Sequence, residues 1–121
     1  MQHRKAVILF GHGSRDPLWR QPIQAVAARL ASQNPELAVR CGYLELNPPD
    51  LPTVAAELIA AGSLTVTVVP MFLGTGKHAR EDLPAMVDRL RTDHPAVTFR
   101  LQPAVGEDPR LLDLLARIAT E

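Results

Sequence analysis

Apolar positions follow two different spacings along this chain. Apolar runs predict four strands, over residues 6–10, 37–44, 64–71 and 97–101, of which the first is expected to be buried. Elsewhere apolar residues recur every three to four positions, which predicts four helices. Their apolar stripes are Ile23, Val26, Ala27 and Leu30; Leu51, Val54, Ala55, Leu58 and Ile59; Leu83, Met86, Val87 and Leu90; and Leu111, Leu112, Leu114, Leu115 and Ile118. The run at 64–71 is rich in β-branched residues, which favours a central strand.

Strand and helix alternate four times, and this order predicts an α/β fold with a parallel sheet and helices on both faces. The 121 residues are enough for one domain, so residues 1–121 are expected to form a single three-layer unit. Right-handed crossovers most simply give the strand order 2-1-3-4. The loops after the first and third strands then meet at one edge of the sheet, where α/β folds bind ligands.

Charge and cysteine content restrict the class of protein. The 13 basic and 13 acidic residues cancel, so nothing overall indicates a nucleic-acid or membrane partner, and electrostatic recognition must be local. Cys41 is the single cysteine, which excludes an internal disulfide and fits a reducing compartment. No apolar run approaches the roughly 20 residues of a membrane span, and no signal-peptide pattern is found at the N-terminus. We expect a cytoplasmic protein.

Two histidines follow predicted strands in glycine-flanked loops. His12 comes after the strand at 6–10, and His78 comes after the strand at 64–71. At the point where strand order reverses they could share one metal ion, because imidazole is a common metal ligand. The alternative is that each histidine bonds to nearby backbone. His3 and His94 precede strands and are expected at the opposite edge, exposed to solvent.

Two carboxylates could assist these histidines. Glu45 lies at the end of the second strand, either as a further ligand or as a solvated charge. Asp82 is expected in the first turn of the third helix, where the helix dipole favours it, or it could orient the His78 ring. Two histidines fall short of the four ligands of a structural zinc site. An open site suits an enzyme that holds a metal briefly.

Basic residues are expected at the same edge of the sheet. Arg15, Lys77 and Arg80 are individually ordinary surface cations, but together they suit a ligand rich in carboxylates. Trp19 precedes the first helical stripe and either packs over the helix start or offers a flat stacking surface. Packing is the favoured interpretation.

Several segments resemble one known family. They are residues 9–17 (LFGHGSRDP), 43–46 (YLEL), 68–84 (VVPMFLGTGKHAREDLP) and 103–109 (PAVGEDP). Together they resemble the sirohydrochlorin chelatases in their short, CbiX-like form. The resemblance covers nearly the whole chain, and the two histidine motifs are specific when they occur together.

The resemblance implies an enzyme that inserts a divalent metal, namely cobalt, iron or nickel, into sirohydrochlorin or a related tetrapyrrole. It implies that His12 and His78 bind the metal and help to remove the pyrrole protons, with Glu45 as a third catalytic residue. Substrate binding is expected from Ser14, Arg15, Lys77 and Arg80. No cofactor beyond the substrate metal is expected.

The resemblance also implies self-association. Long members of the family contain two such domains, and short members resemble a half that pairs with itself. One domain covers one side of a tetrapyrrole, so a homodimer with two-fold symmetry is expected. Leu18, Trp19 and Met71 are candidates for its contact surface.

Two other functions stay open at the level of sequence. One is a metal carrier that delivers ions without catalysis. The other is phosphoryl transfer with His12 as nucleophile. Gly11 stands before His12 where an arginine would be expected, and no clear phosphate clamp follows, which counts against phosphoryl transfer.

Overall fold

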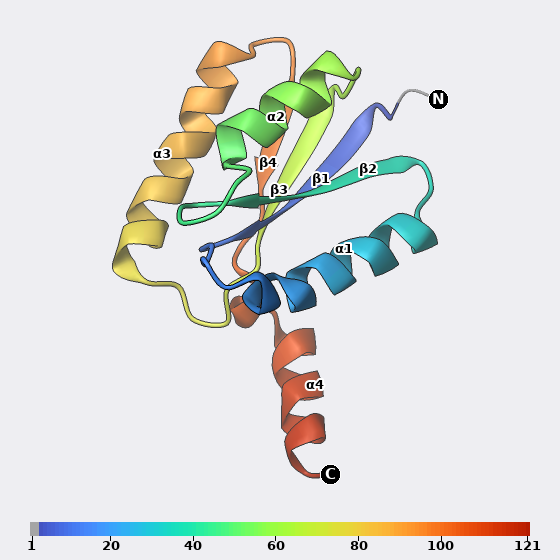
Figure 1. The fold of residues 1–121 in the computed structure, drawn as a ribbon, viewed down its shortest axis with the longest axis vertical. Helices are drawn as coiled ribbons and strands as arrows, with labels where there is room; N and C mark the ends of the chain where they lie inside the picture. The colour runs from blue at the N-terminus through green and yellow to red at the C-terminus, as the bar shows by residue number, and fades with distance from the viewer. Residues whose placement is uncertain (1–2) are drawn as a thin grey trace.

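The computed structural model describes residues 3–121, which contain a four-stranded parallel sheet (Figure 1). The strands are β1 (Lys5–Gly11), β2 (Leu37–Tyr43), β3 (Thr65–Pro70) and β4 (Thr98–Leu101). The helices are α1 (Gln21–Gln33), α2 (Leu51–Ala60), α3 (Lys77–Asp93) and α4 (Pro109–Ala119), with 3₁₀ turns η1 (Pro17–Arg20) and η2 (Val105–Glu107). The strand order is β2-β1-β3-β4, and every neighbouring pair is parallel. The order predicted from the sequence is confirmed.

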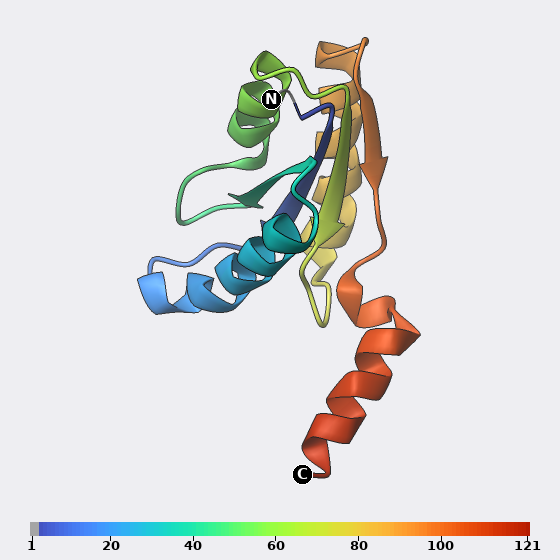
Figure 2. The ribbon, with the colours of Figure 1, turned by 90° about the vertical axis from the view of Figure 1, so that its right-hand side faces the viewer.

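Helices α2 and α3 cover one face of the sheet and α1 covers the other (Figures 1 and 2). The main core lies between the sheet and the α2–α3 layer, with Phe10, Ile8 and Val68 fully buried at its centre. A smaller cluster, formed by Leu9, Ile23 and Tyr43, lies between the sheet and α1. Because strand side chains alternate between faces, β1 contributes to both clusters. The three-layer prediction is confirmed.

Aspartate side chains cap α2 and η1, whereas α1 and α3 begin without a side-chain cap. Asp50 accepts a hydrogen bond from the Thr53 backbone N–H at 2.9 Å and so caps α2. Side-chain and backbone hydrogen bonds from Thr53 lower the pKa of Asp50. Asp16 caps η1 in the same way, and the proline that follows it occupies the first position of that turn.

Helix α4 differs from the other three because none of its residues is buried. It extends away from the sheet at the end of the chain (Figures 1 and 2). Asp108 caps it by accepting a hydrogen bond from the Arg110 backbone N–H at 2.9 Å. Hydrogen bonds from the Arg110 side chain and backbone lower the pKa of Asp108 to about 2, so the cap stays ionised through the neutral range. The helix forms where the sequence predicts it, but it covers neither face of its own sheet.

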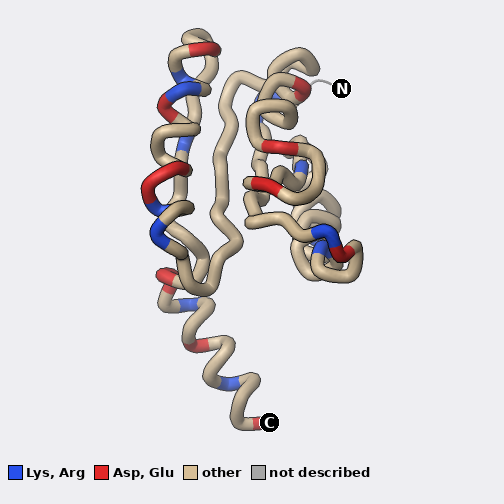
Figure 3. Tube along the Cα trace, turned by 60° about the vertical axis from the view of Figure 1, so that its left-hand side comes forward, with Lys and Arg blue, Asp and Glu red and all other residues tan. Residues whose placement is uncertain are grey.

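The outer surface of α3 is highly charged, with basic and acidic residues interspersed along the helix (Figure 3). Arg91 and Asp88 form an exposed ion pair at 2.8 Å on this surface. Among residues 3–121, no helix has both the length and the apolar character needed to cross a membrane.

Candidate functional site

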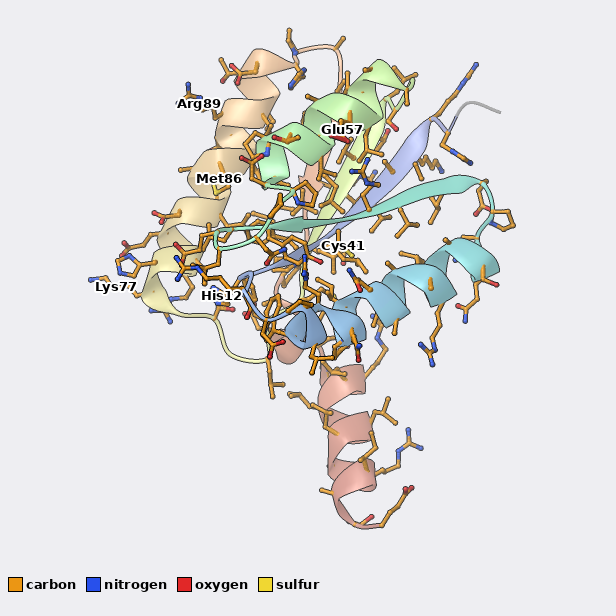
Figure 4. All side chains as sticks on the ribbon, in the orientation of Figure 1. His12, Cys41, Glu57, Lys77, Met86 and Arg89 are labelled. Carbon is orange, nitrogen blue, oxygen red and sulfur yellow. The ribbon has the colours of Figure 1, made fainter. Side chains whose placement is uncertain are left out.

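His12 and His78 line the same cavity, of about 480 Å³, at the carboxyl edge of the sheet. His12 directly follows β1, and His78 is the second residue of α3. Both side chains are exposed, and Figure 4 shows His12 and Lys77 at the same edge of the molecule. The prediction that His78 lies in a loop is wrong, because α3 begins at Lys77 directly after Gly76. His78 is therefore held by the first turn of a helix.

Glu45 lines this cavity because two loops are hydrogen-bonded to each other. The N–H of Leu44 donates to the carbonyl of Gly11 at 2.9 Å, and the N–H of Glu45 donates to the carbonyl of His12 at 3.1 Å. Gly13 has φ +95°, and a Cβ at this position would lie 1.8 Å from the Glu45 carbonyl oxygen. Glycine alone allows this approach, which fixes Glu45 beside His12.

Asn47 also joins these two loops, a role that the sequence analysis missed. Its Oδ1 accepts a hydrogen bond from the Ser14 backbone N–H at 2.7 Å. The Ser14 hydroxyl accepts one from the Asp16 backbone N–H at 3.0 Å, so it also stabilises the turn that follows His12. A substrate contact of Ser14 stays a prediction. An asparagine before two prolines is a turn signal that could have identified Asn47.

Phe72 is a second residue that the sequence analysis missed. It is buried, and its ring centroid lies 4.4 Å from that of His12. Phe72 in turn meets Phe10 of the core edge-to-face, at 5.9 Å and 71°. The His12 imidazole therefore rests on an apolar support connected to the main core. The position of an aromatic residue just after the predicted third strand is the signal in the sequence.

Asp82 lines the same cavity, one turn of α3 beyond His78. Its expected place in the first turn of the helix is wrong, because α3 begins at Lys77 and its first turn contains no acidic residue. The helix dipole acts mainly within the first turn, so it does not account for Asp82. Residues four apart share one side of a helix, and an interaction of Asp82 with the His78 ring stays a prediction.

The three basic residues predicted to bind substrate, Arg15, Lys77 and Arg80, do not line one common cavity. Lys77 lines the histidine cavity. Arg80 instead lines a neighbouring cavity of about 360 Å³, together with Thr75 and Gln102. Ala79 borders both cavities, so the first turn of α3 is the wall between them. Arg15 is exposed in the loop between β1 and η1.

The other two histidines lie at the opposite edge of the sheet, as expected. His3 precedes β1, and its Nε2 is 3.2 Å from the carbonyl oxygen of Pro35. His94 follows the end of α3, near Phe99. Neither one lines the cavity formed by His12 and His78.

Trp19 lies in η1, directly before α1, and is 41% exposed, so the favoured packing interpretation stays a prediction. Its ring centroid lies 6.2 Å from that of Tyr43, and burial is the main cause that raises the pKa of Tyr43 to about 12. Trp19 also lines an apolar groove on the α1 side of the sheet, with a volume of about 410 Å³.

Within the described part of the chain, no three His, Cys, Asp or Glu side chains are grouped closely enough to hold a metal ion. The histidine cavity contains two imidazoles that could bind a metal ion, and the carboxylates of Glu45 and Asp82 line the same cavity. Two nitrogen ligands leave the other coordination positions of a divalent metal open to an incoming ligand.

Comparison with known proteins places this site in context. The family model described as CbiX matches residues 6–121. A protein of Methanococcoides burtonii named "Sirohydrochlorin cobaltochelatase" is 29% identical over 100% of this chain and 98% of its own length. A protein of the same name from Methanococcus aeolicus is 34% identical over 69% of this chain, but the match spans 58% of that relative's length.

Solved structures agree with the family match. A CbiX protein from Marinobacter aquaeolei VT8, described as a putative cobalamin (vitamin B12) biosynthesis protein, has a TM-score of 0.83 and 34% identity, covering 96% of this chain and 94% of its own. The sirohydrochlorin chelatase SirB from Bacillus subtilis subspecies spizizenii, in complex with cobalt, has a TM-score of 0.81 at 23% identity. That match covers 97% of this chain but 50% of SirB, and it supports the fold alone. Because the family model covers nearly all of the sequence, the chain belongs to the CbiX family.

Proposed function

We propose that this protein inserts a divalent metal, cobalt or iron, into sirohydrochlorin. The observation that carries the proposal is the shared cavity of His12, which follows β1, and His78, in the first turn of α3, with Glu45 lining the same cavity. The relatives named for cobalt insertion support the same chemistry.

In the proposed reaction the metal is a substrate held by the His12 and His78 imidazoles. Its open coordination positions accept the nitrogens of the macrocycle, and the tighter four-nitrogen product then draws the metal from the protein. Two pyrrole protons must leave as the metal enters. The Glu45 carboxylate and the imidazoles released from the metal are the bases that line the cavity and accept them.

Lys77 and the start of α3 are suited to the substrate's carboxylates. Lys77 lines the cavity, and Gly76 at the helix N-cap has no side chain to occupy the first backbone N–H groups. Free N–H groups at a helix N-terminus bind anions. The proposal therefore places substrate carboxylates against α3, with Arg15 as a further cation from the loop after β1.

We further propose that two copies form the working enzyme. A tetrapyrrole is a flat macrocycle, and the cavity of one copy covers one side of it. Ligand sites usually bury most of the ligand's surface, so a second wall is expected. SirB supports this proposal because its chain is about twice the length matched by this one.

The direct test is the change in sirohydrochlorin absorbance on metal insertion. The protein should accelerate this change beyond the rate of the free metal, with cobalt and iron tested separately at equal concentration. A carrier that delivers ions without catalysis predicts no acceleration. Absence of acceleration with either metal would overturn the proposed function.

Glu45→Gln should reduce turnover by about tenfold while leaving measurable activity, because the carboxylate assists the two imidazoles and does not replace them. Steady-state rates of metal insertion measure this effect. Glu36→Gln is the matched control, since Glu36 is exposed between α1 and β2 at the opposite edge. An unchanged rate in Glu45→Gln would identify Glu45 as a solvated charge.

A further inference from the structure

Leu46 combines two features that are unfavourable for the isolated domain. Its backbone has φ +71°, and it is the only residue other than glycine with a positive φ among residues 3–121. A leucine is strained in this region because its Cβ crowds the following carbonyl oxygen, whereas glycine and asparagine are tolerated there. The residue is also 53% exposed and belongs to neither of the two apolar clusters of the described chain. Within its own domain, Leu46 therefore carries strain that no apolar burial offsets.

Hydrogen bonds on both sides of Leu46 hold the strained turn in place. The Asn47 N–H donates to the Glu45 carbonyl at 2.9 Å, which closes a three-residue turn with Leu46 at its centre. The Glu45 N–H donates to the His12 carbonyl, and Asn47 Oδ1 accepts a hydrogen bond from the Ser14 N–H. Both neighbours of Leu46 are thus bound to the loop that carries His12. Strained residues that are fixed in this way cluster at ligand sites.

The strand order places Leu46 beside the histidine cavity. Glu45 lines the cavity, and Leu46 is the next residue, with its Cα about 3.8 Å from that of Glu45. Strand β1, which leads to His12, lies between β2 and β3. The loop after β2 therefore borders the cavity on one side of His12, and Lys77, which begins the helix after β3, borders it on the other. The site thus has an exposed apolar side chain on its β2 side and a cation on its β3 side.

A tetrapyrrole with many carboxylates has the complementary distribution of polar and apolar surface. Its conjugated ring is flat and apolar, while its acidic groups project from the periphery. The proposed function places those carboxylates against Lys77 and the start of α3. The ring then extends towards the loop after β2, because the cavity of one copy covers only part of the macrocycle.

We propose that Leu46 contacts the apolar face of the bound macrocycle and holds it over the two histidines. The inference rests on the proposed function and adds a residue that binds the ring of the substrate and not its carboxylates. Burial of Leu46 by the ligand supplies the apolar contact that the free domain lacks. The hydrogen-bonded turn fixes the backbone before the ligand arrives, so little conformational entropy is lost on binding.

Leu46→Asn is the most direct test, because asparagine tolerates positive φ and is close to leucine in size. The substitution should preserve the turn and remove the apolar contact. Burial of the exposed half of a leucine is worth about 5- to 15-fold in affinity, so the dissociation constant for metal-free sirohydrochlorin should rise by that factor. Absorbance titration without metal measures it. Leu46→Met retains an apolar side chain and should bind almost as tightly as the wild type.

Leu64→Asn is the matched control for this experiment. Leu64 is 52% exposed, but it directly precedes β3 and so lies at the opposite edge of the sheet. The same substitution there should leave the dissociation constant unchanged. Equal affinities of Leu46→Asn and the wild type, or equal losses in the two asparagine variants, would contradict the proposal.

Leu46→Gly separates a role in binding from a role in folding. Glycine adopts positive φ without strain, so the Tm of this variant should equal or exceed that of the wild type. Its affinity for sirohydrochlorin should nevertheless fall as it does in Leu46→Asn. A lower Tm accompanied by weaker binding would mean that the leucine acts by shaping the loop, and would count against a direct contact.

Steady-state kinetics with cobalt gives a second criterion. Loss of a contact to the ring should raise KM in Leu46→Asn and leave kcat nearly unchanged. Displacement of Glu45 would instead lower kcat, which is the result expected if Leu46 only positions its neighbour. A change in oligomeric state by light scattering, at unchanged affinity for sirohydrochlorin, would show that a second copy and not the substrate covers Leu46.

Binding and catalysis can fail separately in these experiments. A wild type that binds sirohydrochlorin but inserts no metal would overturn the proposed function and leave the Leu46 contact standing. A wild type that inserts metal, with Leu46→Asn binding just as tightly, would overturn the contact alone. Absence of sirohydrochlorin binding by the wild type would overturn both.

Discussion

His78→Ala should reduce the rate of metal insertion by about 10²- to 10⁴-fold, the range expected when a group that handles both metal and protons is lost. The imidazole lies in the first turn of α3 and is exposed, so its removal leaves no cavity in the core. The measurement is steady-state turnover of sirohydrochlorin with cobalt, together with thermal unfolding to confirm that the fold is intact.

His3→Ala provides the control for this experiment. His3 lies at the opposite edge of the sheet and contacts the carbonyl of Pro35, so turnover should be unchanged. A wild-type rate in His78→Ala would contradict the proposed mechanism, whatever the behaviour of the control.

Gly13→Ala should lower both stability and turnover. The substitution places a Cβ 1.8 Å from the Glu45 carbonyl oxygen at a residue with φ +95°. Backbone strain and overpacking each cost about 1–3 kcal/mol, so a loss of roughly 2 kcal/mol or more is expected, with a decrease of about 5–10 °C in Tm. The clash also pushes Glu45 away from His12, and calorimetry together with turnover measures the two effects.

Gly74→Ala is the matched control for Gly13→Ala. It makes the same chemical change in the β3–α3 loop, where a Cβ would meet no atom within 4 Å. Its Tm should stay close to that of the wild type. Equal effects of the two substitutions would show that the close approach of Gly13 to Glu45 is not the cause.

The fold could be predicted from the sequence because the spacing of apolar residues identifies the strands and helices. Apolar runs and helical stripes located each strand and helix, and the handedness of the crossovers gave the strand order that the structure shows. The path of α4 could not be found in this way. Its leucines predict a helix with one apolar side, but an apolar side does not specify which surface covers it.

The candidate site was only partly accessible, for two physical reasons. The predicted strand order correctly brought His12 and His78 to one cavity. The directions of the other α3 side chains depend on the residue at which the helix begins, and the sequence did not identify that residue. A start at Lys77 turns Arg80 into a neighbouring cavity and puts Asp82 in the second turn. The contacts of Gly13 and Asn47 link distant loops, and no local spacing reveals them.

The unequal packing of the two layers has a consequence for local motion. On the α1 side the buried cluster consists of Leu9, Ile23 and Tyr43, whereas the opposite layer includes the large core around Phe10. Segments with little buried apolar surface open at lower free energy than the rest of a fold. Amide hydrogens of α1 should therefore exchange with solvent faster than those of β1 and β3. No residue of α1 lines the histidine cavity, and His12 rests on Phe72 of the larger core, so α1 can open locally while the cavity keeps its shape.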